Sequence, residues 1–224
     1  MYPLLKRGAD ILFSIIGILI SAPLILISVF LIFLSGETSP FYLSHRIGQG
    51  GKLFRMFKLR TMNRSKPSKS PLTGFNDNRV NFFGRFLRFS KIDELPQFFN
   101  ILNGDLSFVG PRPLLPEVFM YYPKEVRQTL NTVRPGVTGI GSIVFRNESD
   151  LFKKAKGSNE DFYKHRIAPL KADLELWYVK KYSFVVDFKI LIYTVVAVFY
   201  GQVKSIEKRF KNLPSIEILN HRFD

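Results

Sequence analysis

Residues 91–117 contain two adjacent carboxylates, Asp93 and Glu94, and an arginine, Arg112, that lies between two prolines. Neighbouring side chains on a helix point about 100° apart, so the two carboxylates can take separate roles more easily than they can share one. One could act as a nucleophile or a metal ligand and the other as a base. A carboxylate beside a bound phosphate suits Mg²⁺, which takes one or two carboxylates together with substrate phosphates. The alternative for such a pair at a helix start is to complement the helix dipole.

The arginines in and after this segment are candidates for binding phosphate. The prolines on either side of Arg112 fix the backbone, so its guanidinium would lose little entropy when it holds a phosphate through two parallel hydrogen bonds. The alternative for Arg112 is a stiff loop with a solvated side chain. Arg134 stands next to a Pro-Gly turn and could be a second phosphate clamp, although this position also fits a structural role.

The cysteine and histidine content excludes several kinds of active site. The chain has no cysteine, which excludes disulfides, thiolate metal sites and a thiol nucleophile. Its three histidines, at positions 45, 165 and 221, do not have the spacing of metal ligands. The sequence also lacks the glycine-rich dinucleotide-binding motif, the Walker motif and the GxSxG motif of serine hydrolases. Nucleophilic serine or cysteine chemistry is therefore not expected.

The positive charge of the chain is concentrated in one stretch. The net charge is +15, and residues 44–92 contain twelve Lys and Arg against one acidic residue. Such a basic surface attracts anionic lipid headgroups, with about 1 kcal/mol per Lys or Arg, and could also hold a phosphorylated substrate or nucleic acid. Because the stretch follows an apolar segment, we expect membrane lipids and phosphates as partners, with Lys58 and Arg60 as phosphate-binding candidates, and no nucleic acid.

An uncharged apolar run, residues 11–34, is long enough to cross a membrane core and contains Pro23 near its middle. Proline removes a backbone donor and clashes with the carbonyl four residues earlier, so a helix should kink or break there. Basic residues flank the run on both sides, starting with Lys6 and Arg7, and Lys and Arg favour the cytoplasmic side. These features favour a re-entrant helix-break-helix in one leaflet over a single-pass span. A cleaved signal peptide would have a shorter apolar core.

Together these patterns predict a mostly α fold with a short β-hairpin (α+β) in two parts. Residues 1–36 would form the re-entrant membrane anchor, and residues 37–224 a cytoplasmic, membrane-associated catalytic domain. The alternation in residues 52–62 predicts a strand, and the polar residues 63–78 predict a loop. Residues 79–91 have the pattern of a basic amphipathic helix in the membrane interface, with a core helix as the alternative. The apolar residues 190–200 are too few to span and indicate a second buried or interfacial helix.

Several motifs occur together in an order that resembles the bacterial sugar transferases, the monotopic phosphoglycosyl transferases that start glycan assembly on a polyprenyl phosphate. They are KLRTM at 58–62, DELPQ at 93–97, Asn100, GDLS at 104–107, GPRP at 110–113 and RPGVTG at 134–139, and the similarity extends through residues 183–189. The resemblance implies transfer of a sugar-1-phosphate from a UDP-sugar to undecaprenyl phosphate, release of UMP, and Mg²⁺ as cofactor. It also implies a location at the cytoplasmic face of the cell inner membrane, and it leaves room for a homo-oligomer.

The resemblance further implies roles for individual residues in this chemistry. Asp93 would be the nucleophile that attacks the sugar-linked phosphorus and a ligand of Mg²⁺, with Glu94 as its partner in metal or proton handling. Arg112 would clamp phosphate. Two rival functions are a basic membrane-surface binding module without catalysis and a glycosyltransferase that moves only the sugar and releases UDP. The identity of the released nucleotide distinguishes all three.

One departure from the family pattern lies in the predicted anchor. Ala22 precedes Pro23 at a position where the family usually has serine. A helix interrupted at membrane depth must find new donors for its freed carbonyls. Ser21 is therefore the candidate for this role at the predicted point of membrane re-entry.

Overall fold

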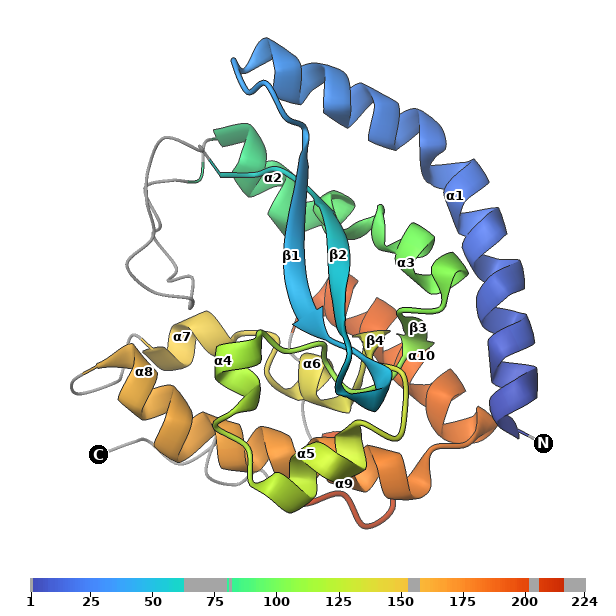
Figure 1. Cartoon of the computed structure of the whole chain (residues 1–224), viewed down its shortest axis with the longest axis vertical. Helices are drawn as coiled ribbons and strands as arrows, with labels where there is room; N and C mark the ends of the chain where they lie inside the picture. The colour runs from blue at the N-terminus through green and yellow to red at the C-terminus, as the bar shows by residue number, and fades with distance from the viewer. Residues whose placement is uncertain (1, 63–79, 81, 153–157, 202–205, 216–224) are drawn as a thin grey trace.

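The computed structural model describes residues 2–62, 80, 82–152, 158–201 and 206–215 (Figure 1). Helices predominate in this part of the chain, beside an antiparallel hairpin and a second, parallel pair of strands. The helices are α1 (Tyr2–Leu34), α2 (Phe82–Ser90), α3 (Gln97–Asn103), α4 (Pro116–Phe119), α5 (Lys124–Leu130), α6 (Ile140–Val144), α7 (Glu148–Phe152), α8 (Asn159–Phe162), α9 (Ala168–Lys181) and α10 (Phe184–Tyr200), and the strands are β1 (Phe41–Ile47), β2 (Leu53–Leu59), β3 (Ser107–Val109) and β4 (Gly136–Thr138). The predicted mostly helical α+β class is confirmed, whereas the parallel pair was not expected. The loop predicted at 63–78 lies outside the described residues.

The hairpin of β1 and β2 is held against α3 by one amide side chain. The two strands pair antiparallel from Phe41 opposite Leu59 to Ile47 opposite Leu53. Asn100 of α3 donates to the Arg55 carbonyl at 2.8 Å and accepts from the Phe57 N–H at 2.9 Å. These two bonds satisfy one carbonyl and one N–H on the outer edge of β2, so α3 covers the middle of the edge at which a third strand would otherwise pair.

The apolar N-terminal segment forms one helix, α1, and the predicted helix-break-helix is not seen as two helices. Pro23 lies inside the continuous helix, which bends part-way along its length (Figure 1). A proline removes a single intrahelical bond, and the turns on both sides can keep the helix together across a bend. The Ser21 hydroxyl donates to the Gly17 carbonyl at 2.6 Å, whereas the carbonyl that faces the proline is that of Leu19. Ser21 therefore does not replace the missing donor.

Both halves of α1 pack against the rest of the protein. In the first half, Arg7 donates to the carbonyls of Ile101 and Leu102 at the end of α3, at 2.6 and 2.9 Å. In the second half, Ile25 and Ile32 are buried in a cluster that also contains residues of β2 and α2. The opposite face is apolar and exposed along its whole length, with Leu12, Phe13, Leu19, Ile20, Leu26, Ile27, Phe30, Phe33 and Leu34. Of the helices in the described part of the chain, α1 is the one long and apolar enough to cross a membrane.

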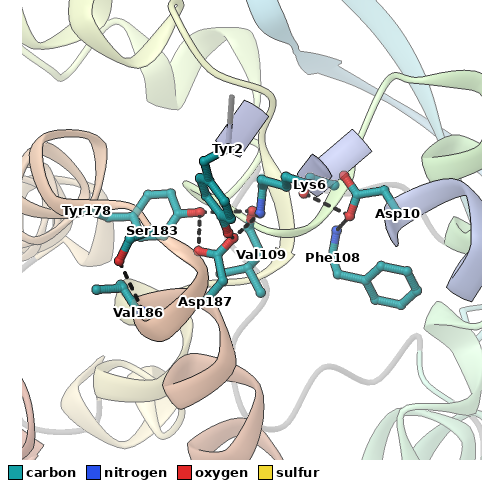
Figure 2. Close-up of polar contacts among 10 residues, drawn as sticks. Tyr2, Lys6, Asp10, Phe108, Val109, Tyr178, Ser183, Val186 and Asp187 are labelled. Carbon is teal, nitrogen blue, oxygen red and sulfur yellow. Dashed lines mark hydrogen bonds and ion pairs between the residues drawn. The ribbon is translucent and has the colours of Figure 1, made fainter. Parts of the chain in front are cut away.

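The first turns of α1 are fixed to the domain by two buried aspartates. Figure 2 shows Tyr2 and Lys6 converging on Asp187 near the start of α10, where the Tyr2 hydroxyl donates to it and Lys6 forms an ion pair with it. Tyr178 of α9 donates to the other Asp187 oxygen at 2.8 Å. Farther along α1, Asp10 accepts from the Phe108 N–H of β3 at 3.1 Å. The first turns of the helix predicted as a membrane anchor are thus an integral part of the fold of the domain.

The main core lies between α5, α6, α9 and α10. Within α2 the predicted aromatic face is divided, because Phe86 and Phe89 are 54% and 84% exposed whereas Phe83 packs against the buried cluster that contains Leu87. The exposed phenylalanines fit the interfacial helix predicted for residues 79–91, of which the helix comprises Phe82–Ser90, and Phe83 fits the core alternative. The stretch predicted at 190–200 belongs to α10, which begins earlier and exposes Phe184 and Phe199.

We expect Asp187→Ala to destabilise the fold, because Lys6, Tyr2 and Tyr178 would all lose their shared acceptor. Removing one partner of a largely buried ion pair costs about 3 kcal/mol. Thermal unfolding in detergent or nanodiscs measures the change, and Lys189→Ala, an exposed position on the same helix, is the matched control. Equal unfolding temperatures for the two variants would contradict a docking role for Asp187.

Candidate active site

Asp93 and Glu94 lie in a single 3₁₀ turn, Ile92–Glu94, between α2 and α3. The turn begins after Lys91, whose left-handed backbone (φ 62°) ends α2 and redirects the chain. It ends at Leu95 and Pro96, after which α3 starts. The Asp93 side chain is turned inward and is 6% exposed. The Glu94 side chain is largely enclosed and is directed to Lys58 of β2, with its carboxylate 2.9 Å from the ammonium.

The surroundings of the two carboxylates move their pKa values in opposite directions. Burial raises the pKa of Asp93 to about 6, and the negative charge of Glu94 adds to this effect. Burial also acts to raise the pKa of Glu94, but the charges of Lys58, Lys91 and Arg112 outweigh it and bring the value down to about 2. At neutral pH both groups are ionised, and Asp93 is the more basic of the two. A pair whose pKa values are pushed apart in this way is suited to two different roles in a reaction.

One oxygen of Asp93 is available for a ligand. Oδ1 is buried, and among the described residues it has no hydrogen-bond partner. The described residues also contain no group of three or more His, Asp or Glu side chains that could hold a metal ion by themselves. Mg²⁺ commonly binds through one or two carboxylates plus substrate phosphates, so this chain fits such an ion with Asp93 as its protein ligand.

A pocket of about 430 Å³ opens beside the turn, between α3, α6, α9 and α10. Its charged lining residues are Lys91, Glu94, Arg112, Arg146, Glu148 and Lys171. Four of these are cations and two are anions, so the pocket favours a negatively charged ligand such as a diphosphate. Asp93 itself is buried and is not among the lining residues, although Lys91 and Glu94 on either side of it in the turn are.

Arg112 is brought to the pocket by the parallel pairing of β3 and β4. Gly110 donates to the Thr138 carbonyl at 2.9 Å, and Gly136 donates to the Pro111 carbonyl at 2.8 Å. A Cβ at Gly136 would collide with the backbone of Gly110, so glycine is required where the two segments meet. The GPRP and RPGVTG motifs therefore contact each other through their backbones. The exposed Arg112 side chain lies at this contact.

The other cations predicted to bind phosphate have different positions. Lys58 reaches the site through its ion pair with Glu94. Arg60 donates to the carbonyls of Ser39 and Phe41, at 2.7 and 3.1 Å, and Arg134 donates to the Gly104 carbonyl at 3.0 Å. Neither Arg60 nor Arg134 lines the pocket, and both tie loops together. Their role in binding phosphate stays a prediction.

Three charged residues near the pocket were not singled out from the sequence as site residues. Burial and the nearby Arg112 lower the pKa of Arg46 to about 10, and its guanidinium donates to the Pro113 carbonyl at 3.4 Å. Lys171 and Glu175 are 5% and 4% exposed on α9. The sequence did contain a signal that Lys171 and Glu175 are special: they are four residues apart on a helix face that otherwise carries core residues.

Comparison with known proteins agrees with this geometry. A family model described as bacterial sugar transferase matches residues 1–201. The chain belongs to the bacterial sugar transferase family. The family resemblance drawn from the sequence motifs is thereby confirmed.

The chain covers different fractions of the lengths of its relatives. It is 32% identical to the UDP-N-acetylgalactosamine-undecaprenyl-phosphate N-acetylgalactosaminephosphotransferase of Aeromonas hydrophila over 90% of the chain, which covers 45% of that protein. It is 32% identical to the undecaprenyl-phosphate galactose phosphotransferase of Salmonella typhimurium over 85% of the chain and 39% of that protein. With the uncharacterized sugar transferase EpsL of Bacillus subtilis it shares 36% identity over 86% of both chains. The chain thus spans less than half of the two larger relatives and most of the third.

We expect Asp93→Asn to stabilise the protein at neutral pH. The folded state keeps the Asp93 proton up to about pH 6, above the ordinary value of 3.8. The contribution of protonated Asp93 to the free energy of unfolding is therefore fully present below about pH 4, and it is lost as the pH rises through about 6. A shift of this size corresponds to about 3 kcal/mol, which the uncharged amide would recover.

The measurement is the unfolding temperature of wild type and variant between pH 4 and pH 8, with EDTA present to remove metal. The two proteins should differ at pH 8 and converge near pH 4. Asp173→Asn, at an exposed position of α9, is the control and should follow the wild type throughout. A difference that does not change with pH would show that Asp93 is not held in a destabilising ionised state.

Proposed function

We propose that this bacterial sugar transferase moves a sugar-1-phosphate from a UDP-sugar to undecaprenyl phosphate and releases UMP, as the first membrane step of polysaccharide or glycoprotein glycan assembly. The observation that carries the proposal is the buried Asp93 carboxylate with an unpartnered oxygen beside a cationic pocket. The names of the Aeromonas and Salmonella relatives describe transfers of this type to undecaprenyl phosphate. A surface-binding module would have no use for a raised-pKa carboxylate in this position.

The proposed reaction has two displacements at one phosphorus atom. In the first, an Asp93 oxygen attacks the sugar-linked phosphorus of the UDP-sugar, and the bond from that phosphorus to the bridging oxygen breaks. UMP leaves with the bridging oxygen, and the sugar phosphate stays on Asp93. In the second, a phosphate oxygen of undecaprenyl phosphate attacks the same phosphorus, which forms the diphosphate lipid and regenerates the carboxylate. Covalent catalysis of this kind divides one difficult transfer into two easier ones.

The residues around Asp93 have separate tasks in this scheme. Arg112, exposed at the pocket, would hold the diphosphate through its guanidinium. The Lys58–Glu94 ion pair keeps Glu94 ionised beside Asp93, and its negative charge makes Asp93 a better nucleophile. The free Asp93 oxygen and the substrate phosphates would hold Mg²⁺, which when bound neutralises charge on the diphosphate.

We expect the purified enzyme to release UMP from a donor in the absence of lipid. With Mg²⁺ and one of UDP-N-acetylgalactosamine, UDP-galactose or UDP-glucose, the release should stop at about one UMP per enzyme molecule, because the acceptor for the second step is missing. Mass spectrometry of the quenched protein should find the added sugar phosphate on the peptide that contains Asp93.

Asp93→Asn should give neither UMP nor adduct, whereas Asp173→Asn should behave as the wild type. If an active donor yields UMP only with undecaprenyl phosphate present, and no adduct forms, the transfer is a single displacement. Release of UDP in place of UMP would overturn the proposed reaction in favour of a glycosyltransferase.

We also propose that α1 enters and leaves the membrane from the cytoplasmic face of the inner membrane. The support is the packing of both its halves on the catalytic domain, through Arg7 in the first half and Ile32 in the second. A straight span would carry one half across the membrane and away from these partners. The exposed apolar face of α1 supplies the lipid contact, and α10 presents a further apolar surface with Phe184, Phe188, Val195, Phe199 and Tyr200. Residues 1–36 and 37–224 then act as anchor and catalytic part of one packed unit.

The topology predicts that both ends of α1 are inaccessible from outside the cell. Leu4→Cys and Thr38→Cys place single thiols at exposed positions on either side of the helix in a chain that has no cysteine. In intact spheroplasts an impermeant thiol reagent should label neither variant, and after lysis it should label both. A co-expressed periplasmic cysteine protein controls for the reagent. Labelling of Leu4→Cys in intact spheroplasts would show a membrane span and would contradict the re-entrant placement.

A further inference from the structure

Glu175 is a buried carboxylate in the middle of α9 that takes no direct part in the proposed chemistry. Only 4% of its surface is exposed, and its neighbours Leu174 and Trp177 belong to the main core. Its Oε2 has no hydrogen-bond partner among the described residues. Burial raises the pKa of Glu175 to about 7, against the opposing effects of the Arg112 backbone and Lys171. A core leucine would be less costly at this position, so stability alone does not account for a carboxylate here.

Glu175 contacts the loop that carries the proposed phosphate clamp. Its Oε1 accepts a hydrogen bond from the Arg112 backbone N–H at 3.3 Å. This N–H is the single backbone donor of residues 111–113, because Pro111 and Pro113 have none. The Gly136 N–H holds the Pro111 carbonyl from the side of β4. The bond from Glu175 adds a second anchor, from α9 and at Arg112 itself.

The carboxylate reaches the loop through a gap left by glycine. A Cβ at Gly141 would collide with Glu175 Oε1, and the nearest contacts of that Cβ all belong to Glu175. Gly141 itself lines the pocket, so the Glu175 carboxylate stands directly behind the pocket wall. The side chain one turn earlier, Lys171, does line the pocket, where its ammonium lies 2.8 Å from Glu148. Helix α9 therefore supplies one buried ammonium group to the pocket and one buried carboxyl group to the loop behind it.

We infer that Glu175 is a positioning residue that holds the Arg112 loop at the pocket through the Arg112 backbone. The inference rests on the proposed function, because it assigns the loop its role in binding the donor diphosphate. Since Glu175 bonds to the backbone N–H, it leaves all the guanidinium donors of Arg112 available to the ligand. Its contribution to transfer must accordingly pass through Arg112.

The test compares Glu175→Leu, which removes the acceptor at similar size, with Glu175→Gln, which keeps an acceptor oxygen. Hydrogen exchange by mass spectrometry on peptides spanning residues 110–115 reports the Arg112 amide in the full-length protein in nanodiscs. We expect faster exchange in Glu175→Leu, by at least tenfold, and little change in Glu175→Gln. The value of kcat/KM for the active UDP-sugar should fall at least tenfold in the leucine variant and less than threefold in the glutamine variant. Asp173→Leu, on the exposed face of α9, controls for the helix.

A double-mutant cycle with Arg112→Ala distinguishes positioning from a general effect on the fold. On the Arg112→Ala background, Glu175→Leu should cause no further loss of kcat/KM, because the residue through which it acts is already gone. Losses that multiply, or unchanged exchange in Glu175→Leu, would overturn the inference. If the leucine variant does not fold, Glu175→Ala takes its place in the same comparison.

Different measurements test the proposed function and the role of Glu175, so one can fail without the other. If the wild type transfers no sugar phosphate from any donor, the proposed function is wrong. The exchange experiment needs no substrate, and it then decides by itself whether Glu175 holds the Arg112 loop.

Discussion

The ion pair between Lys58 and Glu94 is the contact on which the arrangement of the candidate active site depends. It joins β2 of the hairpin to the short turn before α3, and it keeps Glu94 ionised although the carboxylate is largely enclosed. The negative charge kept there acts with burial to raise the pKa of Asp93. Lys58 is the strongest of the cations that lower the pKa of Glu94, ahead of Lys91 and Arg112, so it contributes most to the difference between the two adjacent carboxylates.

A short series of hydrogen bonds also connects α1 to the loop of Arg112. Asp10 of α1 accepts a hydrogen bond from the backbone N–H of Phe108 in β3, and β3 leads directly into the loop of Arg112. The Tyr178 hydroxyl of α9, whose single proton faces both Asp187 and the Val109 carbonyl, lies 3.1 Å from that carbonyl on the other side. The strand that leads to Arg112 is thus held between α1 and the core. In this fold, the docking of α1 and the placement of the Arg112 loop are parts of one structure.

Local patterns were sufficient to predict several elements and the family. The period of the apolar residues located α1, α2, α10 and β2, and the motifs identified the family. The motifs also selected Asp93, Glu94 and Arg112 as candidate site residues, whose roles stay predictions, whereas the parallel pair of β3 and β4 was not predicted. Tertiary pairing was not predictable in the same way. Lys6 and Arg7 were interpreted as topology signals but bind Asp187 and the end of α3, and Arg60 and Arg134 hold backbone carbonyls away from the pocket.

What the sequence determined by itself is the family, the long apolar N-terminal segment and the class of fold, because residue type, periodicity and charge are local properties. Only the tertiary structure decided which ionisable groups are buried and which charges face them. Asp93 and Glu94 are chemically similar neighbours in the sequence, and Glu175 resembles any other acid on a helix. Their pKa values and partners differ because desolvation and Coulomb interactions depend on distances between residues that are far apart along the chain.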